Sequence, residues 1–282
     1  MIEALMGYDI RQLSFAEVLD RSLRILVDNA MLLIGVAIFL GMPMEALPRG
    51  RGWPEVLRWA FTLSWVPFVG AALASATADI YLGRDVTIGS AFKTAWSILF
   101  RYLGTYLIVE AVFLPIFGLF LVSTMLTTKS AVGIRANIGL VILVWLPIAF
   151  ILWTRWILHA PVMVVERRFG MSALRRSSAL VKGAWWRTFG IVLISLVVEL
   201  VPARIFGLLT SSVPVVGTLI QGLVFSFSYA YLATVVTVYY FDRRCRLEDF
   251  DLRYLAEQIR AEGSQTPATA KSAVGSVSGS SA

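Results

Sequence analysis

The sequence predicts an all-α integral membrane protein with six transmembrane helices. The 282 residues are 58% hydrophobic and only 15% charged, whereas soluble domains carry about 25% charged residues. Several uncharged apolar runs approach the roughly 20 residues that an α-helix needs to cross a bilayer. A transmembrane β-barrel would show segments of about ten residues with alternating polarity. The runs here are continuous, so we expect helices to cross the membrane.

The expected spans lie at about residues 30–47, 56–82, 102–126, 138–158, 188–209 and 215–241. Of the 25 Lys and Arg residues, 19 fall in the segments on one side of these spans and 6 on the other. Positive charge is retained on the cytoplasmic side, so we expect both termini inside. Residues 1–262 form the polytopic membrane domain, and the small, polar residues 263–282 are expected to be a disordered tail.

An amphipathic stretch precedes the first, third and fifth spans, and we expect each to form an interfacial helix. The second stretch covers residues 91–101 and the third covers residues 171–185. Ser14 and Glu17 have the spacing of a capping box at the start of the first. The three stretches align without gaps at offsets of 73 and 82 residues, so that Leu19, Phe92 and Leu174 coincide. We interpret this as a threefold internal repeat of an interfacial helix followed by a helical hairpin. A chance match is the alternative.

Three stretches carry a resemblance to a known family. They are Leu13-Ser14-Phe15-Ala16-Glu17-Val18-Leu19-Asp20-Arg21-Ser22; Pro161 and Glu166 through Ala173-Leu174-Arg175-Arg176-Ser177 to Gly183, Trp186 and Arg187; and Tyr240-Phe241-Asp242 with Arg246, Glu248, Phe250-Asp251-Leu252 and Leu255. In this order they resemble the glycerophosphoryl diester phosphodiesterase membrane-domain family of bacteria and archaea. The resemblance implies a multi-pass protein of a prokaryotic cytoplasmic (inner) membrane. It does not imply phosphodiesterase activity, because in two-part relatives a separate soluble barrel carries the catalysis.

Four of the ionisable residues inside the expected spans are candidates for a role there: Asp79, Glu110, Arg155 and Glu199. Ionisable groups in a bilayer are costly, and a functional role is the default hypothesis. Glu110 and Glu199 would be proton-linked or substrate-contacting groups, or else would hold helices together through hydrogen bonds or ion pairs. Asp79 and Arg155 lie near the inner ends of their spans. They would form a mutual salt bridge or extend separately to the interface.

Lipid contact is expected on the third amphipathic stretch. Arg175, Arg176, Lys182 and Trp185 would lie against the anionic inner leaflet. Such lipid contacts, together with the positive charge that is kept on the cytoplasmic loops, account for the net charge of +7. No nucleic-acid-binding motif is recognisable, and we expect no nucleic-acid partner.

The remaining single residues point to packing rather than to chemistry. Cys245 and His159 are the one cysteine and the one histidine of the chain, too few for a Cys/His zinc site, and we expect no metal or cofactor. Gly70, Ala74 and Ala78 recur every four residues, a spacing that lets helices approach closely.

Three function classes follow from these observations. A non-catalytic membrane module that organises or anchors partner proteins is favoured, because no catalytic set is recognisable. A transporter or lipid-handling protein that uses Glu110 and Glu199 is the alternative. An intramembrane enzyme is least favoured, since acids without a nucleophile, metal set or histidine partner make poor catalysts.

Overall fold

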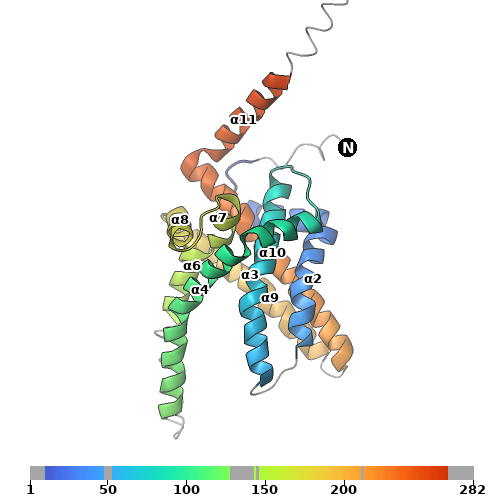
Figure 1. Cartoon of the computed structure of the whole chain (residues 1–282), viewed down its shortest axis with the longest axis vertical. Helices are drawn as coiled ribbons and strands as arrows, with labels where there is room; N and C mark the ends of the chain where they lie inside the picture. The colour runs from blue at the N-terminus through green and yellow to red at the C-terminus, as the bar shows by residue number, and fades with distance from the viewer. Residues whose placement is uncertain (1–9, 48–52, 128–142, 144–145, 211–212, 266–282) are drawn as a thin grey trace, which may run out of the picture.

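A computed structural model describes residues 10–47, 53–127, 143, 146–210 and 213–265 (Figure 1). The elements described are helices. In chain order they are α1 (Phe15–Asp28), α2 (Ala30–Ala46), α3 (Trp53–Tyr81), α4 (Ile88–Thr127), α6 (Leu146–Trp156), α7 (His159–Val165), α8 (Met171–Val181), α9 (Trp185–Leu209), α10 (Pro214–Glu248) and α11 (Phe250–Gln265).

Within the described residues, five apolar helical stretches are long enough to cross a membrane. They are Ala60–Tyr81, Ile88–Val112, Pro147–Val165, Trp185–Leu209 and Val215–Glu248. Helices α1 and α2 are bent by 90° with respect to each other and qualify only as a pair, which brings the number to six. The all-α class expected from composition is therefore confirmed, and six candidate spans are reached when the bent pair counts as one.

The bundle has two chemically different ends. Helices α1, α7 and α8 and the base of α11 gather at one end, which we call the polar end; it lies uppermost in Figure 1. The C-terminal ends of α2 and α9 and the N-terminal ends of α3 and α10 lie at the opposite end. The described segments that carry the basic residues expected inside thus share the polar end.

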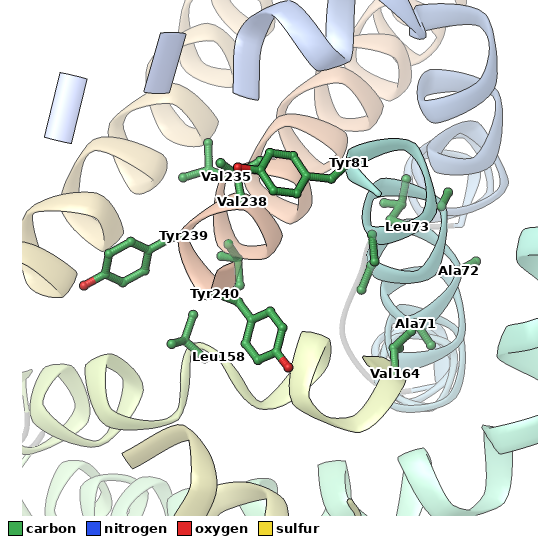
Figure 2. Packing of buried hydrophobic residues seen from close by; sticks show 14 of the residues in the cluster. Ala71, Ala72, Leu73, Tyr81, Leu158, Val164, Val235, Val238, Tyr239 and Tyr240 are labelled. Carbon is green, nitrogen blue, oxygen red and sulfur yellow. The ribbon is translucent and has the colours of Figure 1, made fainter. Parts of the chain in front are cut away.

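Helix α10 is the centre of the packing. It contacts α1, α2, α3, α7, α8, α9 and α11. Val235, Val238 and Tyr240 of α10 are buried in one apolar cluster with Tyr81 of α3 and Val164 of α7 (Figure 2). The core therefore lies around the C-terminal half of α10.

Small residues allow the close packing of α3 that the four-residue spacing predicts. Gly70, Ala74 and Ala78 are buried, and a Cβ at Gly70 would lie 2.8 Å from the Tyr229 hydroxyl of α10. A second close approach, which the sequence pattern did not indicate, joins α2 to α10. A Cβ at Gly41 would lie 2.5 Å from a backbone carbonyl oxygen of α10.

Helix α4 differs from the expectation. Residues 91–101 and 102–126 were expected as an interfacial helix and a span, but they form one unbroken helix. No proline or left-handed glycine lies at the junction of the two stretches, around residue 101. Asn29, by contrast, separates α1 from α2, and Gly183, with φ +80°, lies between α8 and α9. The second unit of the proposed repeat thus lacks the bend of the other two, and the repeat stays a prediction.

The expected fourth span ends at a break between α6 and α7. Pro161 lacks the N–H that would bond the Ile157 carbonyl in a continuous helix. Ser177 of α8 occupies the break: its hydroxyl donates to the Arg155 carbonyl at 2.9 Å and accepts from the Leu158 N–H at 3.2 Å. A side chain from a neighbouring helix therefore satisfies two backbone groups that the break releases.

Two expected segments fall partly outside the described residues. Of the start of the fourth span, 138–142 and 144–145 are not described, and of the polar tail only 263–265, which continue α11, are described.

Candidate functional site

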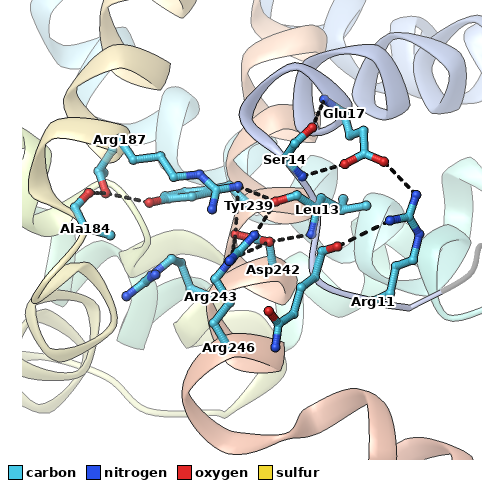
Figure 3. Close-up of polar contacts among 12 residues, drawn as sticks. Arg11, Leu13, Ser14, Glu17, Ala184, Arg187, Tyr239, Asp242, Arg243 and Arg246 are labelled. Carbon is cyan, nitrogen blue, oxygen red and sulfur yellow. Dashed lines mark hydrogen bonds and ion pairs between the residues drawn. The ribbon is translucent and has the colours of Figure 1, made fainter.

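A buried carboxylate lies where the N-terminal segment meets α9 and α10. Asp242 is fully buried, and its Oδ1 accepts hydrogen bonds from the Leu13 backbone N–H at 2.8 Å and from Arg246 Nε at 3.0 Å (Figure 3). Arg187 reaches its other oxygen at 3.2 Å. Both arginines also donate to the Leu13 carbonyl oxygen. We call Leu13, Arg187, Asp242 and Arg246 the Asp242 network.

A second group of charges ties α8 to α10. Arg176 Nε lies 2.9 Å from both oxygens of Glu166, and its guanidinium also pairs with Glu248. Glu248 accepts from Arg244 at 3.0 Å, and the Tyr240 hydroxyl donates to Glu166 at 3.0 Å. Burial lowers the pKa of Arg176, but its bonds to the two carboxylates raise it by more. We call these five residues the Arg176 network.

The chemistry of both networks favours a structural role, in which the side chains hold helices together, over a role in proton transfer. The oxygens of each carboxylate are engaged by guanidinium, hydroxyl or backbone donors, and such charge-assisted bonds are strong and directional. The described residues include no group of three or more His, Cys, Asp or Glu side chains placed to hold a metal ion.

Helix α11 is anchored at its first turn. The Arg244 guanidinium lies 4.2 Å from the centroid of the Phe250 ring, and the Tyr254 hydroxyl donates to the Leu82 carbonyl at 2.9 Å. The chain turns sharply before the helix, at Asp249 with φ +50°. Beyond Tyr254 the helix projects from the bundle (Figure 1), and Leu252 and Leu255 are 65% and 53% exposed.

Three residues singled out from the sequence meet in one cavity. Arg155, Lys182 and Trp185 line an open hollow of about 380 Å³ between α6, α8 and α9, together with Ile151, Ser178 and Val181. We call this hollow the basic cavity. Arg155 was expected inside a span and the other two at the lipid surface, and sequence spacing gave no reason to place them together.

The other intramembrane candidates do not converge. Asp79 pairs with Arg84 at 3.3 Å and not with Arg155. The reason is that α3 ends at Tyr81 and the turn at Gly83, with φ +69°, brings Arg84 back beside Asp79. Glu110 is half-buried and hydrogen-bonds with Tyr106 on its own helix. Glu199 lies on α9, and its side chain is outside the description. Helix α4 packs on α2, α3 and α8, whereas α9 packs on α6 and α10.

Part of the third amphipathic stretch faces protein where lipid was expected. Arg176 belongs to the Arg176 network, and Leu174 and Val181 are buried within the protein. The reason is that α8 packs on α6, α7 and α10 and so turns its apolar face inwards. Arg175 and Lys182 are exposed.

A family model matches residues 56–272, more than three quarters of the chain. The family is described as a domain of unknown function, DUF8558. The chain belongs to this family. No curated protein and no solved structure matches it. The DUF8558 match begins in α3, so the Asp242 network joins Leu13, outside the match, to Arg187 and Asp242 within it.

Sequence reasoning missed the acidic residues of both networks as site candidates. Asp242, Glu166 and Glu248 lie outside the expected spans, where charged residues need no explanation. The i,i+4 spacing of Asp242 with Arg246, and of Arg244 with Glu248, is a local signal for ion pairs. All three acids also belong to the stretches that carry the family resemblance, which was the better signal.

Proposed function

We propose that this DUF8558 protein is a multi-pass protein of a prokaryotic cytoplasmic membrane, with both termini inside, that anchors partner proteins without catalysis. The observation that carries the proposal is α11, a helix fixed to the bundle at its base, on which Leu252, Leu255 and Arg260 are exposed. The relation to the phosphodiesterase membrane-domain family is part of this proposal.

Insertion in a membrane is supported by the surface of the bundle away from the polar end. Large apolar side chains are exposed there on α9 and α10, among them Leu200, Ile205, Leu208, Leu209, Val215 and Leu219. Soluble monomers rarely expose apolar patches of more than a few hundred Å². Acyl chains would cover these residues, and the polar end would lie in the cytoplasm.

A docking role for α11 follows from how it is held. Arg244, Phe250 and Tyr254 fix its direction, so little conformational entropy is lost when a partner binds. Leu252 and Leu255 are three residues apart and therefore lie on one side of the helix. Such a face can enter an apolar groove of a partner.

Transport through Glu110 and Glu199 is the weaker proposal. It needs both carboxylates at one cavity, yet α4 and α9 pack on different neighbours. Glu110→Gln and Glu199→Gln retain the shape and the hydrogen-bonding capacity of the side chain but carry no titrating proton. If transport were the function, both variants would fold normally and lose it.

Photocrosslinking in intact cells tests the docking role of α11. A photoreactive amino acid at Leu252 or Leu255 should yield an adduct with the same recurring protein at both positions. Leu23, which is exposed on α1 at the polar end, is the matched control and should not yield it. In addition, Leu252→Asp combined with Leu255→Asp should abolish co-purification of that protein without changing the melting temperature. Adducts with lipid alone, or equal capture at Leu23, would contradict the proposal.

A further inference from the structure

The basic cavity has an uncompensated positive charge. Arg155 and Lys182 both line it, and its six lining residues include no acid. Within the described residues, neither side chain has an ion-pair partner. By contrast, Arg176, which lies on the same helix as Ser178 and Val181, forms ion pairs with two carboxylates. The cavity therefore differs from the networks beside it in having cations available for an external anion.

Backbone groups add to this positive potential. Helix α9 begins at Trp185, on the cavity wall, and its N-cap residue Ala184 makes no side-chain capping bond. The first N–H groups of a helix have no intrahelical acceptor, and the helix dipole favours an anion there. The two cationic side chains and this 25-residue helix thus direct positive charge to the same place.

The walls of the cavity continue into an apolar surface. Trp185 stacks on Phe189 with ring centroids 5.2 Å apart. On α6, Ile151 and Ile148 lie four and seven residues before Arg155, so they share its helix face. They are 45% and 39% exposed, and the apolar surface therefore continues from the cavity towards the N-terminal end of α6. A ligand with an anionic head and an apolar tail matches this sequence of surfaces.

We propose that the basic cavity binds the phosphate of an anionic phospholipid from the cytoplasmic leaflet, with an acyl chain along Ile151 and Ile148 of α6. Arg155 and Lys182 would contact the phosphate, as basic pockets between transmembrane helices do, and Trp185 would lie at the headgroup level. The proposal rests on the membrane insertion proposed above and is independent of the docking role of α11.

A membrane lipid fits these surfaces better than a soluble phosphate compound does. A soluble anion would use the two cations but leave the exposed Ile151 and Ile148 beside them without a partner. The cavity is also open, which suits a ligand whose tail leaves the site sideways into the bilayer.

Lipid titration of the purified full-length protein tests this site. Native mass spectrometry in detergent would compare phosphatidylglycerol with phosphatidylcholine, two lipids with similar tails. We expect the wild type to prefer phosphatidylglycerol, and Arg155→Gln combined with Lys182→Gln to lower its affinity for that lipid by about tenfold or more. Arg175→Gln is the matched control. It removes one exposed cation from α8 outside the cavity and should leave the preference intact.

The outcomes separate the cavity from general surface charge. Retention of the preference by the double variant, or its equal loss in Arg175→Gln, would overturn the proposal. Displacement of phosphatidylglycerol by millimolar inorganic phosphate would mean that the site belongs to a soluble anion, and would overturn it as well. If the double variant does not fold, Lys182→Gln alone carries the test, because Lys182 is exposed beyond the end of α8. These measurements need no protein partner, so their failure would not affect the crosslinking test.

Discussion

At the scale of single residues, the burial of Asp242 decides what its neighbours must be. A carboxylate removed from solvent is tolerated only when donors and counter-charges surround it. Leu13, Arg187 and Arg246 supply them from three parts of the chain. The carboxylate thereby fixes the N-terminal segment to the bundle.

Asp242→Asn tests the contribution of this charge. Asn can still accept from the Leu13 N–H, but two guanidinium groups would face each other without a counter-charge. We expect the free energy of unfolding to fall by about 3 kcal/mol, seen as a lower melting temperature in detergent. Asp20→Asn breaks the exposed Asp20–Arg24 pair and should change it by less than about 0.5 kcal/mol. Equal losses in the two variants would show that the Asp242 network does not fix the fold.

Two adjacent arginines on α8 give a second comparison. Arg176→Gln leaves Glu166 and Glu248 without their shared partner and should cost about 2 kcal/mol of stability. Arg175→Gln removes an exposed side chain and should stay within about 0.5 kcal/mol. Melting curves of both variants decide the matter. The account of α8 would be wrong if Arg175→Gln were the more damaging change.

At this scale the sequence alone could predict local features, but not which distant residues meet in the fold. The Ser14–Glu17 capping box was predicted from spacing and is present, with both of its hydrogen bonds formed. The Asp242 and Arg176 networks join residues far apart in the chain. Hydrophobic periodicity does not indicate which helix ends lie together, so neither network could be predicted from a sequence pattern.

At the scale of elements, the sequence predicted helices well where apolar runs and breaks coincide. The predicted span at 30–47 corresponds closely to α2, and that at 188–209 lies within α9. The pattern was less informative at α4, because a change from amphipathic to apolar character does not itself end a helix. What ends a helix is a local backbone event, such as the turn at Gly183.

Two glycines should therefore respond in opposite ways to substitution by alanine. Gly183 has φ +80°, so Gly183→Ala would place a Cβ in a strained backbone and destabilise the protein by about 1–2 kcal/mol. Gly104 is helical, and a Cβ there would meet no atom within 4 Å. Gly104→Ala should stabilise α4 by about 0.5–1 kcal/mol. Denaturant titration in mild detergent measures both changes. Destabilisation by Gly104→Ala would mean that α4 is not continuous there.

At the scale of the whole molecule, charge and apolar surface point the same way. The segments expected inside, on the basis of Lys and Arg counts, gather at the polar end, where both networks, the basic cavity and the base of α11 also lie. The exposed apolar side chains in the C-terminal half of α9 and the N-terminal half of α10 lie towards the other end. The helical membrane class could be predicted from the sequence, because it depends only on the numbers of apolar and charged residues and on the lengths of the apolar runs. The packing around α10 depends on three-dimensional contacts, which residue counts do not contain.

Reporter fusions at three positions test the orientation on which the proposed function depends. Fusions after Gly170 and after Gly263 should report the cytoplasm, because they follow segments of the polar end. A fusion after Arg51 should report the external side. Gly170 is the decisive position, since it adjoins α8, the Arg176 network and the basic cavity. A cytoplasmic signal there is the result that we predict, and an external signal would contradict the six-span topology, the lipid site and the docking role of α11 together.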